Sequence, residues 1–211
     1  MKHREKVLQL LDGGGFVRTA TLRRMGIPTI VLTRMVANGE LEIAERGVYR
    51  KPGLGGDETA LRIAEIASRH PKALLCLMSA ARYHRLTDDL YSEWSIAMPT
   101  RSDLQIMAGV RLYRWLSPKS YDQGVETIEI AGVAVKMTNP ARTVADMIRA
   151  RNGQASEHAL GAYAAFLASG GEPEEVSEHA RALGFENQVS KITPYVRRML
   201  DHGAFEGRPG L

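Results

Sequence analysis

The sequence predicts an α+β protein, with a small basic N-terminal module followed by a mixed α/β body and a helical C-terminal part. Three observations carry this prediction. Helical periodicity over the first forty residues changes to strict alternation around a glycine turn. Three glycines then fall within residues 52–57, which is typical of a domain junction. Beyond the junction, apolar runs of strand length are followed by amphipathic stretches of helical length. A chain of 211 residues is long enough for two such domains.

Positive charge is concentrated in the N-terminal module. Residues 1–56 contain ten Lys/Arg and five Asp/Glu, a net charge of +5, whereas the other residues contain 18 and 19, a net charge of −1. This asymmetry favours a nucleic-acid-facing module on a neutral body, although many solvated surfaces also carry a positive excess.

The single cysteine and the absence of long apolar runs restrict where the protein acts. Cys76 lies in the apolar run ALLCLM, which predicts a buried thiol and excludes an internal disulfide. No 18 apolar residues are consecutive, and the charged start MKHREKVLQLLDGG lacks the apolar core of a signal peptide. We expect a soluble, cytoplasmic protein without a membrane span.

The N-terminal pattern predicts a helix-turn-helix. A first amphipathic helix is followed by a second over 19–25, with Thr19 or Thr21 as its N-cap and with Leu22 and Met25 facing inward. Gly26 suits the end of that helix, and Pro28 begins a third helix over about 28–38. Two helices joined by a tight glycine turn form the helix-turn-helix pattern.

A short hairpin with a cationic tip follows directly. In GELEIAERGVYRKP, residues 39–52, Leu41 and Ile43 alternate with glutamates before the chain turns at Gly47. A hairpin added to a helix-turn-helix predicts a winged helix, in which one helix enters the major groove while the wing reaches phosphates. The residues that we expect to contact DNA are Arg23, Arg24, Thr29, Thr33, Arg34, Arg46, Arg50 and Lys51.

The rest of the chain predicts a linker at 53–57, an α+β body over 58–203 and a flexible tail at 204–211, after a DNA-binding domain at 1–52. Strand patterns at 94–98, 110–115, 125–130 and 132–137 predict a small sheet of about four strands. Helical patterns cover 58–69, 79–84 and, from residue 140, 140–151, 156–169, 173–183 and 187–202.

Four polar residues of the body stand out. Arg142 and Asp146 are four apart on one helix face, where a charge pair forms readily, and Thr138 or Asn139 suits the N-cap of that helix. His84 near Asp88 allows a base and its orienting carboxylate, but a histidine that caps a helix end or bonds a backbone carbonyl is the simpler explanation. No histidine spacing matches a metal site, so we expect no metal, no cofactor and no catalysis.

These segments resemble a known family. Residues 13–52, GGGFVRTATLRRMGIPTIVLTRMVANGELEIAERGVYRKP, are similar to the N-terminal domain of AbiEi-type antitoxins of type IV toxin–antitoxin systems. AARYHRLTD at 80–88, EIAGVAVK at 129–136 and TNPARTVADMIR at 138–149 resemble later segments of that family.

The resemblance implies a winged-helix repressor of its own promoter that binds double-stranded DNA at inverted repeats. It also implies an antitoxin opposing a toxin of nucleotidyltransferase type, while direct contact between the two proteins stays open. His84, Asp88, Arg142 and Asp146 then belong to the motif of the antitoxin body. We expect a monomer or a weak dimer, because no heptad seam predicts a coiled coil.

Two alternatives remain open at this point. A winged helix also serves as a protein-interaction module, with a body that binds a partner. A metal-dependent nuclease is less favoured, because Glu126, Glu129 and Lys136 lack the Asp/Glu-x-Lys spacing that holds Mg²⁺.

Overall fold

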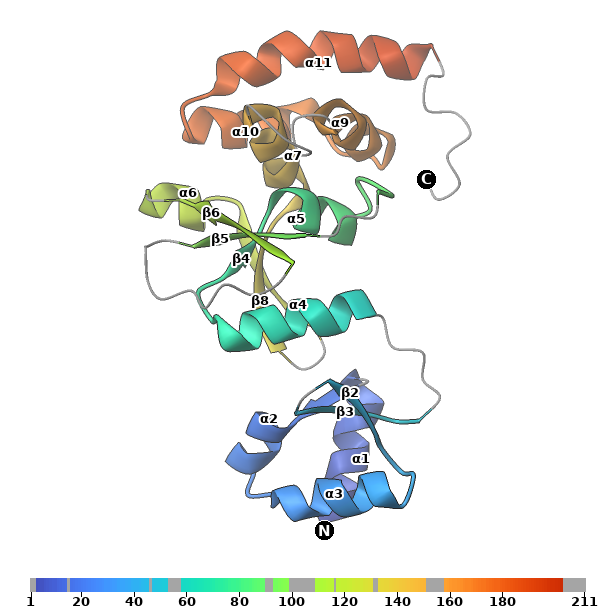
Figure 1. Ribbon diagram of the computed structural model, residues 1–211. Coiled ribbons are helices and arrows are strands. Elements are labelled where there is room, and N and C mark those ends of the chain that lie inside the picture. Colours follow the sequence, from blue (N-terminus) through green and yellow to red (C-terminus); the bar gives the residue numbers. More distant parts are fainter. Residues whose placement is uncertain are drawn as a thin grey trace. The chain divides into compact units, whose positions relative to one another are not determined.

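The computed structural model describes residues 3–14, 16–45, 47–52, 58–89, 93–98, 109–115, 117–130, 133–150 and 158–202. The chain divides into two compact units, one formed by Met1–Arg69 with Ile128–Val135 and the other by His70–Thr127 with Lys136–Leu211. Helices and two separate sheets give a mixed α+β architecture, as predicted (Figure 1). The predicted linker at 53–57 and the tail at 204–211 lie outside the described residues, and the domain boundaries stay a prediction.

Three helices and a three-stranded sheet form the N-terminal part. The helices are α1 (His3–Gly14), α2 (Thr19–Arg24) and α3 (Thr29–Ala37), and the strands are β1 (Phe16–Arg18), β2 (Glu42–Glu45) and β3 (Val48–Arg50). β3 lies between β1 and β2 and pairs antiparallel with both. This order of elements is consistent with a winged helix-turn-helix (Figure 1).

A small apolar core holds these elements together. Val7 and Leu11 of α1 are buried with Leu22 of α2 and with Leu32 and Met35 of α3. The spacing of four in α1 and of three in α3 places one apolar stripe of each longer helix inward. The hairpin adds Leu41 and the half-buried Tyr49 to this core, and Val48 is buried as well.

Three details of this part differ from the sequence prediction. Arg18, not Thr19 or Thr21, is the N-cap residue of α2, and it makes no side-chain capping bond. Met25 is not inward, because α2 ends at Arg24 and Met25 occupies the turn, 45% exposed. Strand β1 was not predicted, because Phe16–Arg18 is too short to show a period.

A five-stranded sheet forms the centre of the body, rather than the predicted four strands. Its order is β6-β5-β4-β8-β7. The predicted strands correspond to β5 (Trp94–Met98), β6 (Val110–Arg114), β7 (Val125–Ile130) and β8 (Val133–Thr138). The additional strand, β4 (Leu74–Leu75), has two residues inside a fully buried apolar run, where neither a helix nor a strand period is visible. β4 pairs antiparallel with β5 and parallel with β8, while β5 pairs parallel with β6.

Helices account for the remaining described elements. α4 (Glu58–Arg69) and α5 (Leu77–Tyr83) come early, and the short α6 (Pro118–Asp122) was not predicted. The C-terminal helices are α7 (Pro140–Arg149), α9 (Ala159–Ala168), α10 (Pro173–Ala182) and α11 (Glu186–Asp201). α7 packs against α5, α9 and α10, and α11 packs against α9 and α10.

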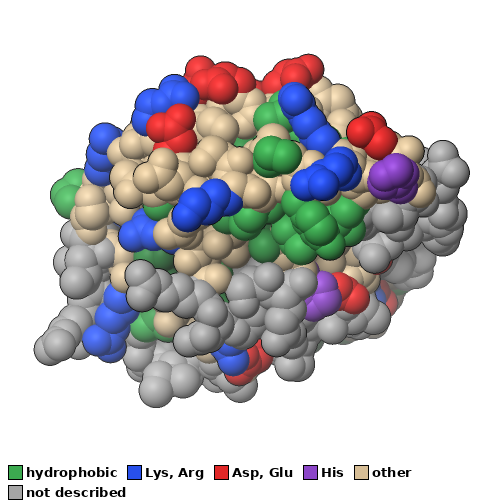
Figure 2. All heavy atoms as spheres, turned by 90° about the horizontal axis from the view of Figure 1, so that it is seen from above, with side chains coloured by type: hydrophobic (Ala, Val, Ile, Leu, Met, Phe, Trp, Pro, Cys, Tyr) green, Lys and Arg blue, Asp and Glu red, His purple; other side chains and the backbone are tan. Residues whose placement is uncertain are grey.

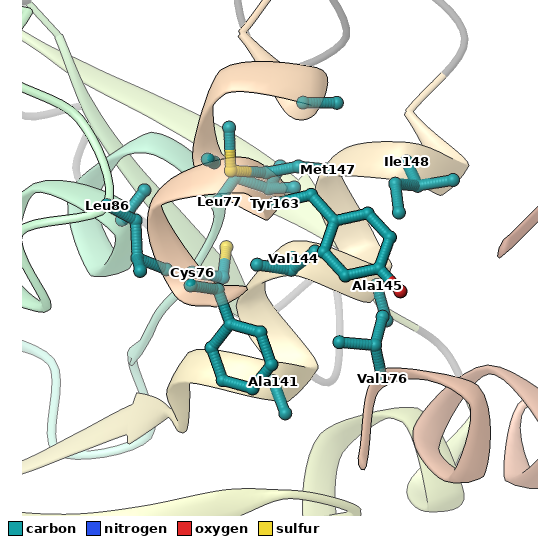
Figure 3. Packing of buried hydrophobic residues seen from close by; sticks show 14 of the residues in the cluster. Cys76, Leu77, Leu86, Ala141, Val144, Ala145, Met147, Ile148, Tyr163 and Val176 are labelled. Atoms are coloured by element: carbon teal, nitrogen blue, oxygen red, sulfur yellow. The ribbon is translucent and has the colours of Figure 1, made fainter. Parts of the chain in front are cut away.

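Helix α7 lies in the middle of the apolar core of the body. Residues 141–148 are all buried, so this helix is surrounded by other elements. Val144, Met147 and Ile148 of α7 gather around the ring of Tyr163 from α9, with Val176 of α10 beside it (Figure 3). Cys76 is fully buried in the same cluster, and burial raises the pKa of its thiol well above the ordinary range.

Charges of both signs cover the face on the α11 side of the body. Figure 2 shows Lys and Arg side chains among Asp and Glu side chains on that face. Arg181 of α10 lies 3.1 Å from the Glu174 carboxylate and 2.7 Å from that of Glu186. In the described part of the chain, no helix is long and apolar enough to cross a membrane.

Candidate nucleic-acid interface

The turn between α2 and α3 is built by Gly26. Its φ of +73° lies in the left-handed region that glycine adopts at little cost, and the Gly26 N–H donates to the carbonyl of Arg23. Ile27 is buried directly after it, and Pro28 stands as the N-cap residue of α3. The predicted glycine turn is confirmed, while α3 begins one residue later than predicted.

Helix α3 presents a solvent-facing side that carries predicted contact residues. Leu32 and Met35 are buried, so the opposite face is left to solvent. Thr33 and Arg34 are exposed on it, and Thr29 is half-buried in its first turn. The sequence prediction placed the same residues off the core stripe.

Arg23 and Arg24 extend this face from the end of α2. Both side chains are exposed, and Arg23 Nε lies 3.4 Å from Thr29 Oγ1, which links the two helices. Within the part of the chain that the structure describes, Arg24 and Arg34 form no ion pair. Their charges are therefore available to a polyanion.

The hairpin contributes less free charge than the sequence suggests. Arg46 lies outside the described residues. Arg50 forms an ion pair with Glu42 across the β2–β3 ladder, so its charge is largely compensated within the protein. Lys51 is half-buried just after β3. The exposed cations of α2 and α3 thus form the better-defined surface, which we call the α2–α3 face (Arg23, Arg24, Ile30, Thr33, Arg34, Ala37).

In the body, Arg142 and Asp146 form a buried ion pair, as their spacing predicts. Nε of Arg142 donates to Oδ2 of Asp146 at 2.8 Å, and the two side chains are 0% and 4% exposed. The guanidinium also donates to the carbonyl oxygens of Ser120, at 2.8 Å, and Gln123. Burial raises the pKa of Asp146 to about 6, and Arg142 opposes that rise.

This pair anchors the start of α7. Asn139 is the N-cap residue, and its Oδ1 accepts from the N–H of Arg142 at 2.8 Å, which confirms one of the two predicted caps. The guanidinium also lies 5.0 Å from the ring centre of Trp115. Arg142 therefore joins α7 to Trp115, Ser120 and Gln123.

His84 and Asp88 do not form a catalytic pair in the structure. The ring of His84 bonds through Nε2 to the carbonyl oxygen of Thr138 at 2.7 Å, and burial lowers its pKa. Asp88 is exposed, and the hydroxyl of Thr87 donates instead to Asp89 at 3.2 Å. Bonding to a backbone carbonyl was the simpler of the two interpretations, and it is the one that the geometry supports.

His179 is a central residue that the sequence analysis missed. Its Nε2 lies 3.2 Å from the amide nitrogen of Asn139, and its Nδ1 lies 3.3 Å from that of Gln123. Oδ1 of Asn139 accepts from the N–H of Arg142, so the NH₂ group of Asn139 faces the imidazole ring of His179. A histidine nitrogen that accepts a hydrogen bond carries no proton, so the His179 ring is neutral in this arrangement. Burial, and then the charge of Arg142, lower the pKa of His179. A lone histidine on an amphipathic helix gave no signal for this position.

No metal site emerges from these side chains. Over the described ranges, no three His, Cys, Asp or Glu residues come close enough together to hold a metal ion. Among the described residues, the α2–α3 face is exposed to solvent, whereas Arg142 and Asp146 are buried.

A helix-turn-helix with an exposed cationic outer face, beside a hairpin, is an arrangement typical of DNA-binding transcriptional regulators. Comparison with protein families agrees: residues 5–52 match the family of AbiEi antitoxin transcriptional regulators. The matched segment includes α2, α3 and the hairpin, so the resemblance drawn from GGGFVRTATLRRMGIPTIV and RGVYRKP is confirmed there. No curated protein matches the chain.

Proposed function

We propose that this protein is a DNA-binding autorepressor and the antitoxin of a type IV toxin–antitoxin system. The observation that carries the proposal is the coincidence of two features in residues 5–52: the family match, and the free cationic face of α2 and α3. On this proposal, α3 enters a major groove while Arg23 and Arg24 neutralise phosphates beside it. The protein binds inverted repeats in its own promoter as a monomer or a weak dimer, and it acts as a regulator rather than as an enzyme.

The first test measures binding to the duplex upstream of the protein's own gene at several salt concentrations. Each phosphate contact contributes about 0.9 to the slope of log K against log salt. Arg24→Ala combined with Arg34→Ala should therefore weaken binding and lower the magnitude of that slope by as much as about 2.

A matched control removes two exposed arginines whose charges are already compensated. Arg111 lies 3.0 Å from Glu93, and Arg181 pairs with Glu174 and Glu186. The variant Arg111→Ala with Arg181→Ala should retain the wild-type slope. Equal slopes for both double variants would refute the assignment of the α2–α3 face.

The wing is tested separately. Arg46→Glu with Arg50→Glu should weaken retardation of the promoter fragment, because it adds two negative charges to the hairpin that we place against DNA. Unchanged binding at every salt concentration would remove the hairpin from the interface and leave α2 and α3 as its only part.

The antitoxin role rests on the family match and on the resemblance in the body. We propose that the toxin is a nucleotidyltransferase-like protein encoded beside this gene. Growth arrest on expression of the neighbouring gene alone, relieved by co-expression of this chain, is the expected result. Arrest that this chain does not relieve would overturn the antitoxin role without affecting the DNA-binding proposal.

A further inference from the structure

The outer face of α3 carries a large apolar side chain. Ile30, Thr33, Arg34 and Ala37 follow one another at spacings of three, one and three, so they share one side of the helix. Ile30 is 54% exposed at the N-terminal end of this row. Leu32 and Met35 already supply the buried stripe, so packing within the protein does not explain an isoleucine at position 30.

The hydroxyl groups beside Ile30 are engaged within the protein. Thr33 Oγ1 donates to the carbonyl oxygen of Thr29 at 3.4 Å, and Thr29 Oγ1 lies 3.4 Å from Nε of Arg23. Both threonines are among the residues that the sequence analysis expects to contact DNA, either by donating a hydrogen bond or through the side-chain methyl group. In the structure, the proton of the Thr33 hydroxyl faces its own helix, so Thr33 adds a methyl group to the row that Ile30 begins.

Cations lie on and beside this apolar row. Arg34 belongs to the same face, and Arg23 and Arg24 at the end of α2 are exposed as well. This surface places aliphatic side chains among exposed arginines. It therefore suits a partner whose phosphate groups lie on either side of an apolar group. The major groove of DNA has this arrangement, because the C5-methyl group of thymine is the apolar group among its base edges.

We propose that Ile30 is a specificity-determining residue that contacts the C5-methyl group of thymine in the operator, with the methyl groups of Thr33 and Ala37 extending the contact. The inference rests on the proposed DNA-binding function and deepens it, because it names the base that α3 selects. Arg34, in contrast, is placed to bond a base edge or a phosphate.

The experiment begins by selecting binding sites for the full-length protein from a randomised duplex library. Each thymine of the enriched site is then replaced in turn by deoxyuridine, which removes the methyl group and keeps every hydrogen-bonding atom. Burial of one methyl group stabilises by about 0.8 kcal/mol, so at least one replacement should weaken binding about fourfold.

Two single variants assign the effect to a residue. Ile30→Ala should weaken binding to the thymine duplex and lose the difference between thymine and deoxyuridine at that position. Ile43→Ala is the matched control, because Ile43 is an isoleucine that is 60% exposed on β2 rather than on α3. It should keep the full difference. Thermal melting confirms that both variants fold, as the exposure of the two side chains leads us to expect.

The outcomes separate the inference from the proposed function. An enriched site at which every deoxyuridine duplex binds as tightly as its thymine counterpart overturns the role of Ile30 and leaves DNA binding intact. The role is also overturned when Ile30→Ala keeps the full fourfold difference. Failure of the wild-type protein to enrich any sequence, or to bind any duplex at low salt, overturns both.

Discussion

Replacement of Arg142 by methionine tests the buried pair at the start of α7. The side chain is 0% exposed and bonds to Asp146 and to the carbonyl oxygens of Ser120 and Gln123. Arg142→Met keeps a long apolar side chain in place but removes all three of these interactions. The variant therefore isolates the charge and its hydrogen bonds from simple packing.

The magnitude has two parts. Without Arg142, a buried Asp146 becomes protonated, and keeping an ordinary carboxyl group of pKa about 3.9 protonated near pH 7 costs about 4 kcal/mol. Each buried carbonyl that loses its donor adds about 1–3 kcal/mol. A loss of about 5 kcal/mol or more compares with a typical total stability of about 5–15 kcal/mol. The variant should be barely folded at neutral pH.

The pH dependence supplies the sharper signature. In the variant, the folded-state pKa of Asp146 lies far above its unfolded value, so its unfavourable contribution grows as the pH rises above about 4. Between about pH 7 and about pH 5 this part of the cost falls by as much as about 2.7 kcal/mol. The wild-type chain shows a smaller change, because Arg142 holds the pKa of Asp146 closer to its ordinary range.

Urea denaturation followed by circular dichroism at both pH values measures these free energies, and the slope with urea checks that unfolding stays two-state. Arg181→Met is the control, because Arg181 is exposed in its ion pairs with Glu174 and Glu186 and should change stability little. A loss in Arg142→Met that is no larger than in this control, or that does not diminish at lower pH, would refute the reasoning.

Three further predictions concern the same region. Gly124→Ala should destabilise by about 2–4 kcal/mol in a urea melt, because φ is +63° and a Cβ atom would lie 2.7 Å from Cε1 of His179 and 2.8 Å from Cβ of Arg142. Gly184 has a φ of +80°, and no atom lies within 4 Å of the added carbon. Gly184→Ala should therefore lower the free energy of unfolding only by the cost of the left-handed backbone conformation, about 1 kcal/mol. Equal losses would contradict the close approach at Gly124. Asn139→Ala should cost about 1–2 kcal/mol through loss of the N-cap, and Asn139→Asp should restore most of it; no recovery would exclude capping as the cause. The ring of His179 should titrate below its ordinary pKa of about 6.5 by nuclear magnetic resonance. Because the folded-state pKa is lowered, the favourable contribution of His179 is fully present above the unfolded value of about 6.5 and is lost as the pH falls from there through the lower folded-state pKa, so His179→Gln should flatten this part of the stability profile.

Local patterns predicted most elements of the fold. The range 58–69 for α4 and the ranges of β5 and β7 agree with the structure, because periods of 3.6 and of 2 are visible over five or more residues. β1 and β4 were missed because three and two residues cannot display a period. Their strand character comes from partners distant in the chain, such as Arg50 for Phe16 and Lys136 for Leu74.

The sequence predicted which residues of the candidate interface lie on its surface, but not which ion pairs and hydrogen bonds they form. Spacing alone placed Thr33 and Arg34 on the outer face of α3. It did not show that Glu42 compensates Arg50 or that the hydroxyl of Thr33 bonds to Thr29, because both depend on side-chain geometry. Likewise, the pairing of Arg142 with Asp146 follows from the helix period, whereas the carbonyl oxygens of Ser120 and Gln123 come from a segment about twenty residues earlier.

Strand β4 has a mechanical consequence for the body. It is the middle strand of the sheet, yet only Leu74 and Leu75 pair with β5 on one side and with β8 on the other. So short a ladder supplies few backbone hydrogen bonds between the two halves of the sheet. Packing of the fully buried side chains of Leu74, Leu75 and Cys76 therefore contributes much of what joins them. We therefore expect bending of this sheet to be easiest at β4, where the ladder is shortest.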